Sequence, residues 1–440
     1  MRVDVRLNAR RLILDNSIKH DEDAIAPPRR AGACDVTSDS ISTADDDGRS
    51  FWRDVVVAFG LSLGAAVALG FSRFSYGLLL PPMRADLAWT YVEAGALNTA
   101  NGVGYIAGAL VAAWTARRWG PARAFIGGFV VSVAVLLLTA ASTRLAVLFA
   151  LRTVGGLSTA LTFIVGAGLA SAICPTQHPR RRGGLVGLYV AGVSIGVLLA
   201  GIAVPLVLRG GVQHWPEGWL ALGLMSALAL PAAAWAARQV PAPSGGGAAV
   251  LRRGELRQLA PTLIGYGLFG AGYVGYMTFI MALLQDQGGS SGQLAGFWLV
   301  LALVSAVSTL LWGRALAGLH DGRGAAIVFA TAMLGTLPVL LWSGPVAMFV
   351  SAVLFGGSYL AGPTSITLVA QRQLPAASWT AAISLLTVGF ALGQAIGPVL
   401  AGAISDATGS IAAGFWVSPL LLGVAACVNL LQRPPSAASQ

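Results

Sequence analysis

The sequence predicts an all-α integral membrane protein of twelve transmembrane helices, arranged as two parallel six-helix repeats. Three observations lead to this prediction. Charged residues make up only 10% of the 440 residues and apolar residues 56%, whereas a soluble protein carries about 25% charged residues. Long uncharged stretches follow one another after residue 50, and two glycine motifs recur at one fixed spacing.

The uncharged stretches give the number of helices. Ten stretches of 20 residues or more lack Asp, Glu, Lys and Arg: 94–116, 124–143, 153–179, 183–208, 218–237, 258–285, 287–313, 324–371, 373–405 and 407–432. As a helix, each is long enough to cross about 30 Å of hydrocarbon at about 1.5 Å per residue. The stretch 324–371 is long enough for two helices, divided at residues 342–345, and a first segment covers about 55–80. The total is twelve, whereas strands of a β-barrel would alternate in polarity over roughly ten residues.

The arginines are distributed unevenly between the two sets of loops. One set holds thirteen: Arg117, Arg118, Arg123, Arg180, Arg181, Arg182, Arg238, Arg252, Arg253, Arg257, Arg314, Arg323 and Arg372. The opposite set holds three: Arg84, Arg144 and Arg209. Because positive loops stay in the cytoplasm, we expect a multi-pass protein of the cytoplasmic (inner) membrane with both termini cytoplasmic. The net charge of +10 then reflects the arginines of the cytoplasmic loops. The expected partners are the lipid bilayer and a small-molecule substrate. Nucleic acid is not expected as a partner, and a monomer is expected to be the functional unit.

The chain divides into five parts. Residues 1–50 hold ten of the eighteen acidic residues and no apolar run, which predicts either a disordered cytoplasmic tail or a mis-assigned start codon. Residues 51–237 form the first six-helix half and residues 259–432 the second. A Pro- and Gly-rich linker, 238–258, joins them in the cytoplasm, and residues 433–440 form a second tail.

The repeat is visible in two glycine motifs. The sequence GVSIGVLLAG at residues 192–201 recurs as GQAIGPVLAG at residues 393–402, and the pair 155–156 recurs as 356–357, both 201 residues later. Six helices per half return the chain to the same side, so the halves are expected to be parallel repeats. Glycines four residues apart let helix backbones approach closely. They predict packing seams along which the halves could also move, and the gating glycines on these motifs are Gly156, Gly192, Gly196, Gly393 and Gly397.

Two arginines lie inside apolar segments. An arginine within a membrane helix costs roughly 2.5–3.5 kcal/mol on insertion scales, so it usually faces a protein interior or a wet cavity. Arg73 lies eight residues before Pro81, or about 12 Å below the outer end of its helix, and Arg152 is expected at the same depth. Guanidinium groups bind carboxylates through paired hydrogen bonds, so the two arginines favour an anionic substrate. The alternative is that they pair internally, or that Arg73 extends to the outer surface.

Polar residues at helical spacing indicate what surrounds the arginines. Such residues lie on one face of their helices, either as contacts to a substrate or as hydrogen bonds between helices. The candidate substrate-binding residues besides Arg73 and Arg152 are Tyr76, Asn98, Asn101, Tyr105, Tyr266, Tyr273, Tyr276 and Gln394. No carboxylate lies near the middle of any predicted span. Glu93, at the outer start of the second helix, is therefore the candidate for proton coupling, unless an acidic substrate carries the proton itself.

Several of these residues belong to a stretch with a recognisable pattern. GFSRFSYGLLLPPMRADL at residues 70–87, followed by Glu-Ala-Gly at 93–95, resembles the YbfB/YjiJ-type branch of the major facilitator superfamily. The resemblance covers nearly all of residues 51–440. It implies a central cavity between two halves, and it places Arg152 and Gly156 on the Arg-x-x-x-Gly pattern of the fourth helix.

The same resemblance also identifies departures from the superfamily pattern. The loop between the second and third helices, ARRWGPAR at residues 116–123, keeps the glycine and cations of the Gly-Asp-Arg-Gly-Arg signature, but an arginine stands where an aspartate is expected. Its gating candidates are Arg117, Arg118, Gly120 and Arg123. The Gly-Pro pair of the antiporter signature is absent from the fifth helix and present in the eleventh, which adds Pro398 to the gating residues.

Together these features predict a secondary active transporter for a small organic solute, with a preference for organic anions, working by alternating access and coupled to an ion or proton. Two alternatives stay open: efflux of hydrophobic or neutral compounds, and a non-transporting sensor on a transporter scaffold. An enzyme is not expected, because no His/Asp or Cys/His constellation is visible. A P-loop pump needs a lysine, and only Lys19 exists. Cys34, Cys174 and Cys427 have no paired spacing, so neither a metal nor a cofactor is expected.

Overall fold

The computed structural model describes residues 39–173, 179–241, 251–319, 321–375 and 378–432. The chain divides into two compact units, residues 1–50 and residues 51–440, and the description below concerns the second. Helix α1 begins at Asp39, inside the predicted N-terminal tail. The rest of that tail, the centre of the predicted linker and the predicted C-terminal tail lie outside the described residues.

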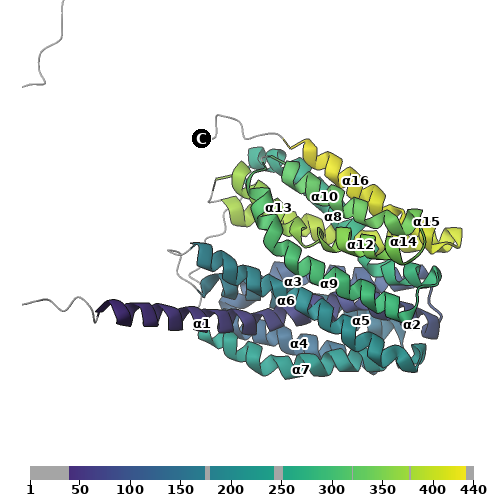
Figure 1. The fold of residues 1–440 in the computed structure, drawn as a ribbon, viewed down its shortest axis with the longest axis horizontal. Helices are drawn as coiled ribbons and strands as arrows, with labels where there is room; N and C mark the ends of the chain where they lie inside the picture. The colour runs from purple at the N-terminus through teal and green to yellow at the C-terminus, as the bar shows by residue number, and fades with distance from the viewer. Residues whose placement is uncertain (1–38, 174–178, 242–250, 320, 376–377, 433–440) are drawn as a thin grey trace, which may run out of the picture. The chain divides into compact units, whose positions relative to one another are not determined.

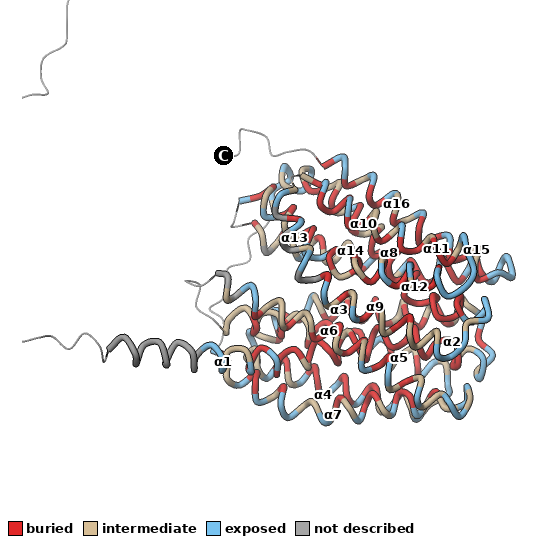
Figure 2. The backbone as a smooth tube through the Cα atoms, viewed as in Figure 1, coloured by how far each residue is buried: buried red, intermediate tan, exposed pale blue. Residues whose placement is uncertain are grey.

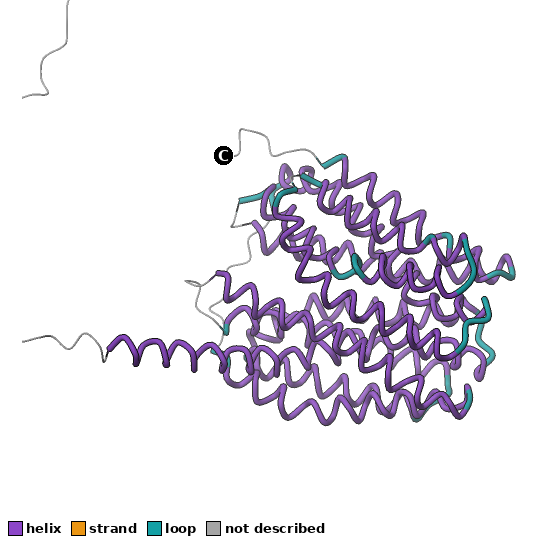
Figure 3. Tube along the Cα trace, viewed as in Figure 1, coloured by secondary structure: helices purple, strands orange, loops and turns teal. Residues whose placement is uncertain are grey.

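Every regular element in the described part of the chain is a helix, as Figure 3 shows. In chain order the helices are α1 (Asp39–Ala65), the π-helix η1 (Ala66–Phe74), α2 (Ser75–Leu87), α3 (Tyr91–Trp119), α4 (Pro121–Ala140), α5 (Leu145–Ala172), α6 (Pro179–Val207), the short 3₁₀ helices η2 (Leu208–Gly210) and η3 (Val212–His214), α7 (Trp215–Gln239), α8 (Arg253–Asp286), α9 (Ser291–Ala317), α10 (Arg323–Thr336), α11 (Pro338–Leu341), α12 (Pro345–Gly356), α13 (Ala361–Gln373), α14 (Trp379–Thr408), α15 (Ile411–Phe415) and α16 (Val417–Leu430).

Eleven stretches of helix in the described residues are long and apolar enough to cross a membrane. The predicted second span is the exception. Helix α3 has 29 residues, long enough to cross, but it is the least apolar of the predicted spans. Its polar residues, which include Asn98, Asn101 and Tyr105, account for the difference, and they are the residues that the sequence assigned to the site.

The first span ends later than the sequence predicted. Pro81 and Pro82 lie inside α2, which continues to Leu87 and stops at Ala88 in the left-handed conformation (φ 53°), a common helix terminator. The predicted end near residue 80 is therefore wrong by about two turns. The predicted division at residues 342–345 is confirmed, because α11 ends at Leu341 and α12 begins at Pro345 after Gly344 (φ 112°).

The helices pack as two bundles, which we name by their order in the chain. In the N-terminal bundle (residues 51–239), α5 packs against α3 and α4, α4 against α7, and α6 against η1. In the C-terminal bundle (residues 253–430), α8 packs against α14 and α16, and α12 against α9 and α10. Figure 1 shows α1, α4 and α7 below and α10, α14 and α16 above. The bundles meet where α3 contacts α14, α6 contacts α9 and α2 contacts α8.

Burial follows this arrangement only in part (Figure 2). The spans 51–87 and α8 are the most buried, as expected for helices at the centre. Helices α7 and α16 expose large apolar side chains, among them Leu228 on α7 (82% exposed) and Leu420 on α16 (64%), which water would not tolerate in such numbers. Helices α4 and α5 are buried to the same extent as each other.

Candidate functional site

The site is built around a π-helical segment. Residues 66–74 of η1 are wound as a π-helix, and eight of these nine residues are buried. Both the backbone N–H and the hydroxyl of Ser75 donate to the carbonyl of Gly70. Gly70 lies directly against the backbone of Gly196 on α6, where a Cβ would come within 2.6 Å of the Gly196 Cα. Such segments are rare and often lie at functional positions. Here the segment ends with Arg73 in its last turn, pointing into the protein.

Arg73 is 5% exposed and makes no ion pair within the described residues. Its Nη2 donates to Gln394 Oε1 on α14 at 2.6 Å, and its guanidinium lies 4.9 Å from the centre of the Tyr105 ring on α3. Its Nε bonds no group of the described protein. A buried charge normally has a charged or fully hydrogen-bonded environment, so Arg73 keeps donor capacity that the protein does not use.

Arg152 on α5 is equally buried but more completely bonded. Its Nη1 donates to the carbonyl of Ser72 at 2.7 Å, and its Nη2 to Asn98 Oδ1 at 3.4 Å. The guanidinium lies 4.5 Å from the centre of the Tyr76 ring, and the Tyr76 hydroxyl is bound to the carbonyl of Ala94. Arg152 therefore ties α5 to the residue before Arg73 and to α3.

The two arginines belong to neighbouring parts of the N-terminal bundle, since Arg152 reaches the carbonyl of the residue before Arg73. Their common depth in the membrane stays a prediction. Arg73 lies 14 residues before the end of α2 at Leu87. Three other residues lie at a similar distance from the helix ends on the same side of the bundles. Tyr105 is 14 residues after the start of α3, Tyr273 is 13 residues before the end of α8, and Gln394 is 14 residues before the end of α14.

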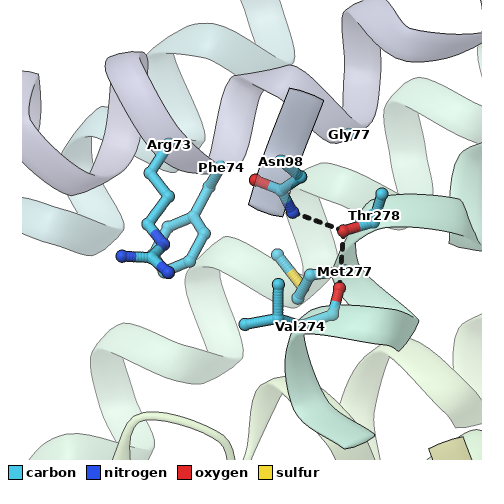
Figure 4. A pocket seen from close by; sticks show the side chains of 7 residues that line it. All are labelled: Arg73, Phe74, Gly77, Asn98, Val274, Met277 and Thr278. Carbon is cyan, nitrogen blue, oxygen red and sulfur yellow. Dashed lines mark hydrogen bonds between the residues drawn. The ribbon is translucent and has the colours of Figure 1, made fainter. Parts of the chain in front are cut away.

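A small pocket lies between the bundles beside Arg73 (Figure 4). It is lined by Arg73, Phe74, Gly77, Asn98, Val274, Met277 and Thr278. Its volume of about 10 Å³ is room for about one water molecule. One hydrogen bond, from Asn98 Nδ2 to Thr278 Oγ1 at 2.6 Å, crosses the pocket from α3 to α8. The pocket is closed to any organic solute in this conformation.

Aromatic rings form a wall on the side of the C-terminal bundle. Phe74 meets the rings of Tyr273 and Tyr359 edge to face, with centroids 6.2 and 6.0 Å apart. Tyr273 in turn stacks on Tyr359 at 5.7 Å and on Phe390 at 5.9 Å. Edge-to-face and offset-stacked rings at these distances attract one another, so the wall is ordered by its own contacts.

The remaining predicted substrate-binding residues are placed less favourably for contact with a substrate at Arg73. Asn101 donates to the backbone carbonyl of Arg152 at 3.2 Å, which joins α3 to α5. Tyr266 stacks on Phe390 at 4.4 Å, two helical turns from Tyr273. Tyr276 shares a 2.7 Å hydrogen bond with Ser351 on α12, so its hydroxyl faces the interior of the C-terminal bundle and not Arg73.

Glu93 has a structural role in this conformation. Its carboxylate accepts from the backbone N–H of Thr90 at 2.9 Å, and the Thr90 hydroxyl accepts from the N–H of Glu93. This reciprocal pair is a capping box that begins α3. Proton coupling through Glu93 stays a prediction.

The predicted gating cations lie on the surface. Arg117, Arg118 and Arg123 are exposed at the end of α3 and the start of α4, and Gly120 between them has a φ of 86°, which favours glycine. Their gating role also stays a prediction.

The glycines of the repeated motif form matching seams inside the two bundles. A Cβ at Gly192 or Gly196 would overlap the carbonyls of Ser62 and Ala66 in the first span. A Cβ at Gly393 or Gly397 would overlap the carbonyls of Gly267 and Ala271 on α8.

The second glycine pair behaves in the same way. A Cβ at Gly156 would overlap the carbonyl of Asn101 on α3, and one at Gly356 would come within 2.8 Å of the carbonyl of Leu301 on α9. The carbonyl of Pro398, by contrast, lies across the boundary between bundles, within 2.6 Å of a Cβ built on Gly95.

Two contacts at the boundary had no signal in the sequence. Thr278 bonds Asn98 as described above, and Asp406 on α14 accepts from the backbone N–H groups of Tyr91 and Val92 at 2.9 and 2.7 Å. Asp406 thus caps the first turn of α3 from the other bundle. Both pairings join residues far apart in the chain, which local patterns cannot reveal.

Comparison with known proteins assigns this arrangement to a family. The sequence family described as "Uncharacterised MFS-type transporter YbfB" matches residues 65–430. The chain belongs to the major facilitator superfamily. As an MFS transporter of the YbfB type, it is a multi-pass membrane protein that transports small organic solutes.

Two relatives and two solved structures illustrate the range of this superfamily. The chloramphenicol resistance protein of Streptomyces lividans is 30% identical over 387 residues, 83% of this chain and 93% of that protein. The 3-(3-hydroxy-phenyl)propionate transporter of Escherichia coli (strain K12) is 26% identical over 410 residues, 86% and 95% of the two chains. A bacterial homolog of the human lysosomal transporter Spinster, crystallised in an inward-facing and unoccupied conformation, has a TM-score of 0.68 at 14% identity and covers 86% of this chain and 95% of its own. A point mutant of the nucleoside transporter NupG has a TM-score of 0.64 at 12% identity, with 84% and 98% covered. At such identities the structures establish the fold alone.

Proposed function

We propose that this MFS transporter is a secondary carrier of a small organic anion, which binds at Arg73 between the two bundles. The observation that supports this most strongly is the unused donor capacity of a buried guanidinium at the boundary of the bundles. A carboxylate would satisfy it with charge-assisted hydrogen bonds. The relative named as a 3-(3-hydroxy-phenyl)propionate transporter agrees with an organic acid as cargo.

The carrier has twelve spans in two parallel repeats: the eleven apolar stretches described above and, in addition, α3. The matching glycine seams support the repeat, since Gly196 meets the first span as Gly397 meets α8, and Gly156 meets α3 as Gly356 meets α9. With both termini in the cytoplasm, the end that carries Leu87, Tyr91, Asp286 and Thr408 is the outer end.

In this conformation the two bundles are closed against each other at the outer end. The hydrogen bonds that join the bundles beside α3 lie from mid-span to the outer end: Arg73 to Gln394, Asn98 to Thr278, Thr99 to the carbonyl of Ala395 at 2.5 Å, and Tyr91 and Val92 to Asp406. Transport requires these contacts to break so that the site opens outward, while the inner ends close. Coupling to protons through Glu93 or through the substrate belongs to this proposal.

A second candidate function is export of an uncharged drug-like solute, since the relative named for chloramphenicol resistance is 30% identical. Counterflow into sealed proteoliposomes tests both. Vesicles preloaded with unlabelled benzoate or chloramphenicol are given the labelled compound outside, and a carrier produces a transient, saturable accumulation. We expect accumulation of benzoate, and its loss in Arg152→Ala, because that residue holds the segment that presents Arg73. Binding without counterflow would favour a sensor, and counterflow of chloramphenicol alone would favour export.

A further inference from the structure

We propose that the cargo of this site is an aromatic monocarboxylate, with its carboxylate on Arg73 and its ring against the aromatic wall. The inference rests on the proposed function and goes further in two respects: it gives the two arginines different roles, and it specifies both the charge and the shape of the substrate.

The two arginines differ in what they can still bind. Both terminal nitrogens of Arg152 donate to protein oxygens, and its plane is covered by Tyr76. Arg152 is therefore a positioning residue, which holds the carbonyl of Ser72 and so fixes the turn that carries Arg73. The Nε of each arginine bonds no group of the described protein, but Arg73 donates through only one terminal nitrogen, to a neutral amide.

The free donor indicates a single carboxylate. A side-on carboxylate accepts from Nε and one Nη in parallel, and this pair is stronger than a hydrogen bond to a neutral amide. A ligand carboxylate would displace the side chain of Gln394 and occupy Arg73. A second carboxylate on the same ligand would find only Arg152, whose two terminal nitrogens already donate to protein oxygens, and an unpaired charge at this depth is unfavourable.

The neighbours of Arg73 indicate a planar ring. The Tyr105 ring lies on one side of the guanidinium. Phe74, the residue after Arg73, contacts the rings of Tyr273 and Tyr359. Phe390, which stacks on Tyr273, is only partly buried. These rings come from both bundles, and a flat aromatic ligand would extend their stacked and edge-to-face contacts in a way that a saturated ring cannot.

Binding must be coupled to movement of the bundles. The pocket of about 10 Å³ admits no ring, and the amide that a carboxylate would displace belongs to α14 across the boundary. A ligand that breaks the bond between Arg73 and Gln394 therefore removes one of the contacts that keep the outer ends together, which is how a substrate shifts the equilibrium between conformations.

Thermal unfolding of the purified full-length protein in detergent tests the assignment, because a ligand of the folded state raises the Tm by mass action. The probes are benzoate and 3-phenylpropionate, each compared with its neutral amide, with cyclohexanecarboxylate as the saturated acid and with terephthalate as the dianion. We expect a dose-dependent increase in Tm with the aromatic monocarboxylates, and an apparent affinity at least tenfold weaker for each of the other probes.

Two variants and a matched control locate the effect. Arg73→Gln should remove the response, and Arg144→Gln, an exposed arginine of the same bundle, should retain it. Gln394→Glu provides a built-in carboxylate for Arg73, so it should raise the Tm without ligand and remove the response to benzoate. This variant keeps the test valid if Arg73→Gln does not fold.

Three results would overturn the proposal. Equal stabilisation by the neutral amides or by chloramphenicol would refute the anion, and equal stabilisation by cyclohexanecarboxylate would refute the aromatic ring. An unchanged response in Arg73→Gln or Gln394→Glu would refute Arg73 as the binding residue. Failure of this substrate assignment can be distinguished from failure of the proposed transport function. A protein that binds benzoate but shows no counterflow would support the binding site and contradict only transport.

Discussion

Arg73 on η1 and Gln394 on α14, 321 residues apart in the chain, share a 2.6 Å hydrogen bond at the boundary between the two bundles. Both side chains are almost fully buried, at 5% and 2% exposed. The bond therefore joins the bundles at mid-depth, and it also occupies one of the donors through which a substrate would bind.

Removing the amide should leave a buried charge without its partner. We expect Gln394→Ala to lower the free energy of unfolding by about 1–3 kcal/mol, because a buried donor loses its acceptor. In the double variant Arg73→Gln/Gln394→Ala the loss should be smaller than the sum of the single losses, since the two residues interact. Denaturation of the four proteins in the same detergent measures this coupling, and additive losses would mean that the bond contributes nothing.

Arg152 should matter more for stability than Arg73. Arg152→Ala removes two hydrogen bonds from a charged donor and the contact with Tyr76, so we expect a loss of roughly 3 kcal/mol. Arg73→Ala removes one hydrogen bond and should cost less. Half-inactivation temperatures from fluorescence-detected size-exclusion chromatography compare the two, and the reverse order would contradict the roles assigned to them.

The close seam between α5 and α3 should not accept a methyl group. Gly156→Ala places a Cβ on the carbonyl of Asn101, whereas Gly168 on the same helix has nothing within 4 Å of such an atom. We expect Gly156→Ala to cost about 1–3 kcal/mol through overpacking and to slow counterflow. Gly168→Ala should be neutral or slightly stabilising, because alanine favours the helix, and equal effects of the two changes would exclude the seam as the cause.

Glu93→Gln separates capping from proton coupling. Glutamine keeps an oxygen that can accept from the N–H of Thr90, so the helix start should survive. If Glu93 carries the proton, accumulation driven by a pH gradient should disappear while counterflow continues. Glu217→Gln, an exposed carboxylate outside the site, is the control. Accumulation that persists in Glu93→Gln would instead indicate that the substrate brings the proton.

Much of the fold could be predicted because membrane helices are marked by composition alone. The scarcity of charge and the uncharged runs located the spans, and the arginine bias gave a topology. The end of the first span was wrong because Pro81 and Pro82 are tolerated inside α2, and the π-helical winding of η1 had no signal in the residue pattern.

The surroundings of Arg73 were predicted in outline, and their role in binding a substrate stays a prediction. Arg73, Arg152 and Asn98 stood out because polar groups in a membrane segment need a partner, and the structure brings them together. Tyr276 faces away because α8 is buried on nearly all sides, so a polar face on this helix has no unique direction. Thr278 and Asp406 depend on which helices meet across the boundary, and no local pattern contains that information.

The central claim is that the two bundles move against each other around the Arg73 site. Distances between pairs of spin labels, measured by double electron–electron resonance, test this claim most directly. Spin labels are placed on exposed positions in a background without native cysteines: Thr143 and Ala407 near the outer end, Trp119 and Gln371 near the inner end. Asp406→Ala removes the acceptor that binds the start of α3 from the other bundle, a change worth about 0.5–2 kcal/mol for a helix cap.

The account predicts a reciprocal response. In Asp406→Ala a population with a longer Thr143–Ala407 distance should grow, and the same fraction of molecules should show a shorter Trp119–Gln371 distance. A change at one end only, or no change at either end, would contradict alternating access around this site.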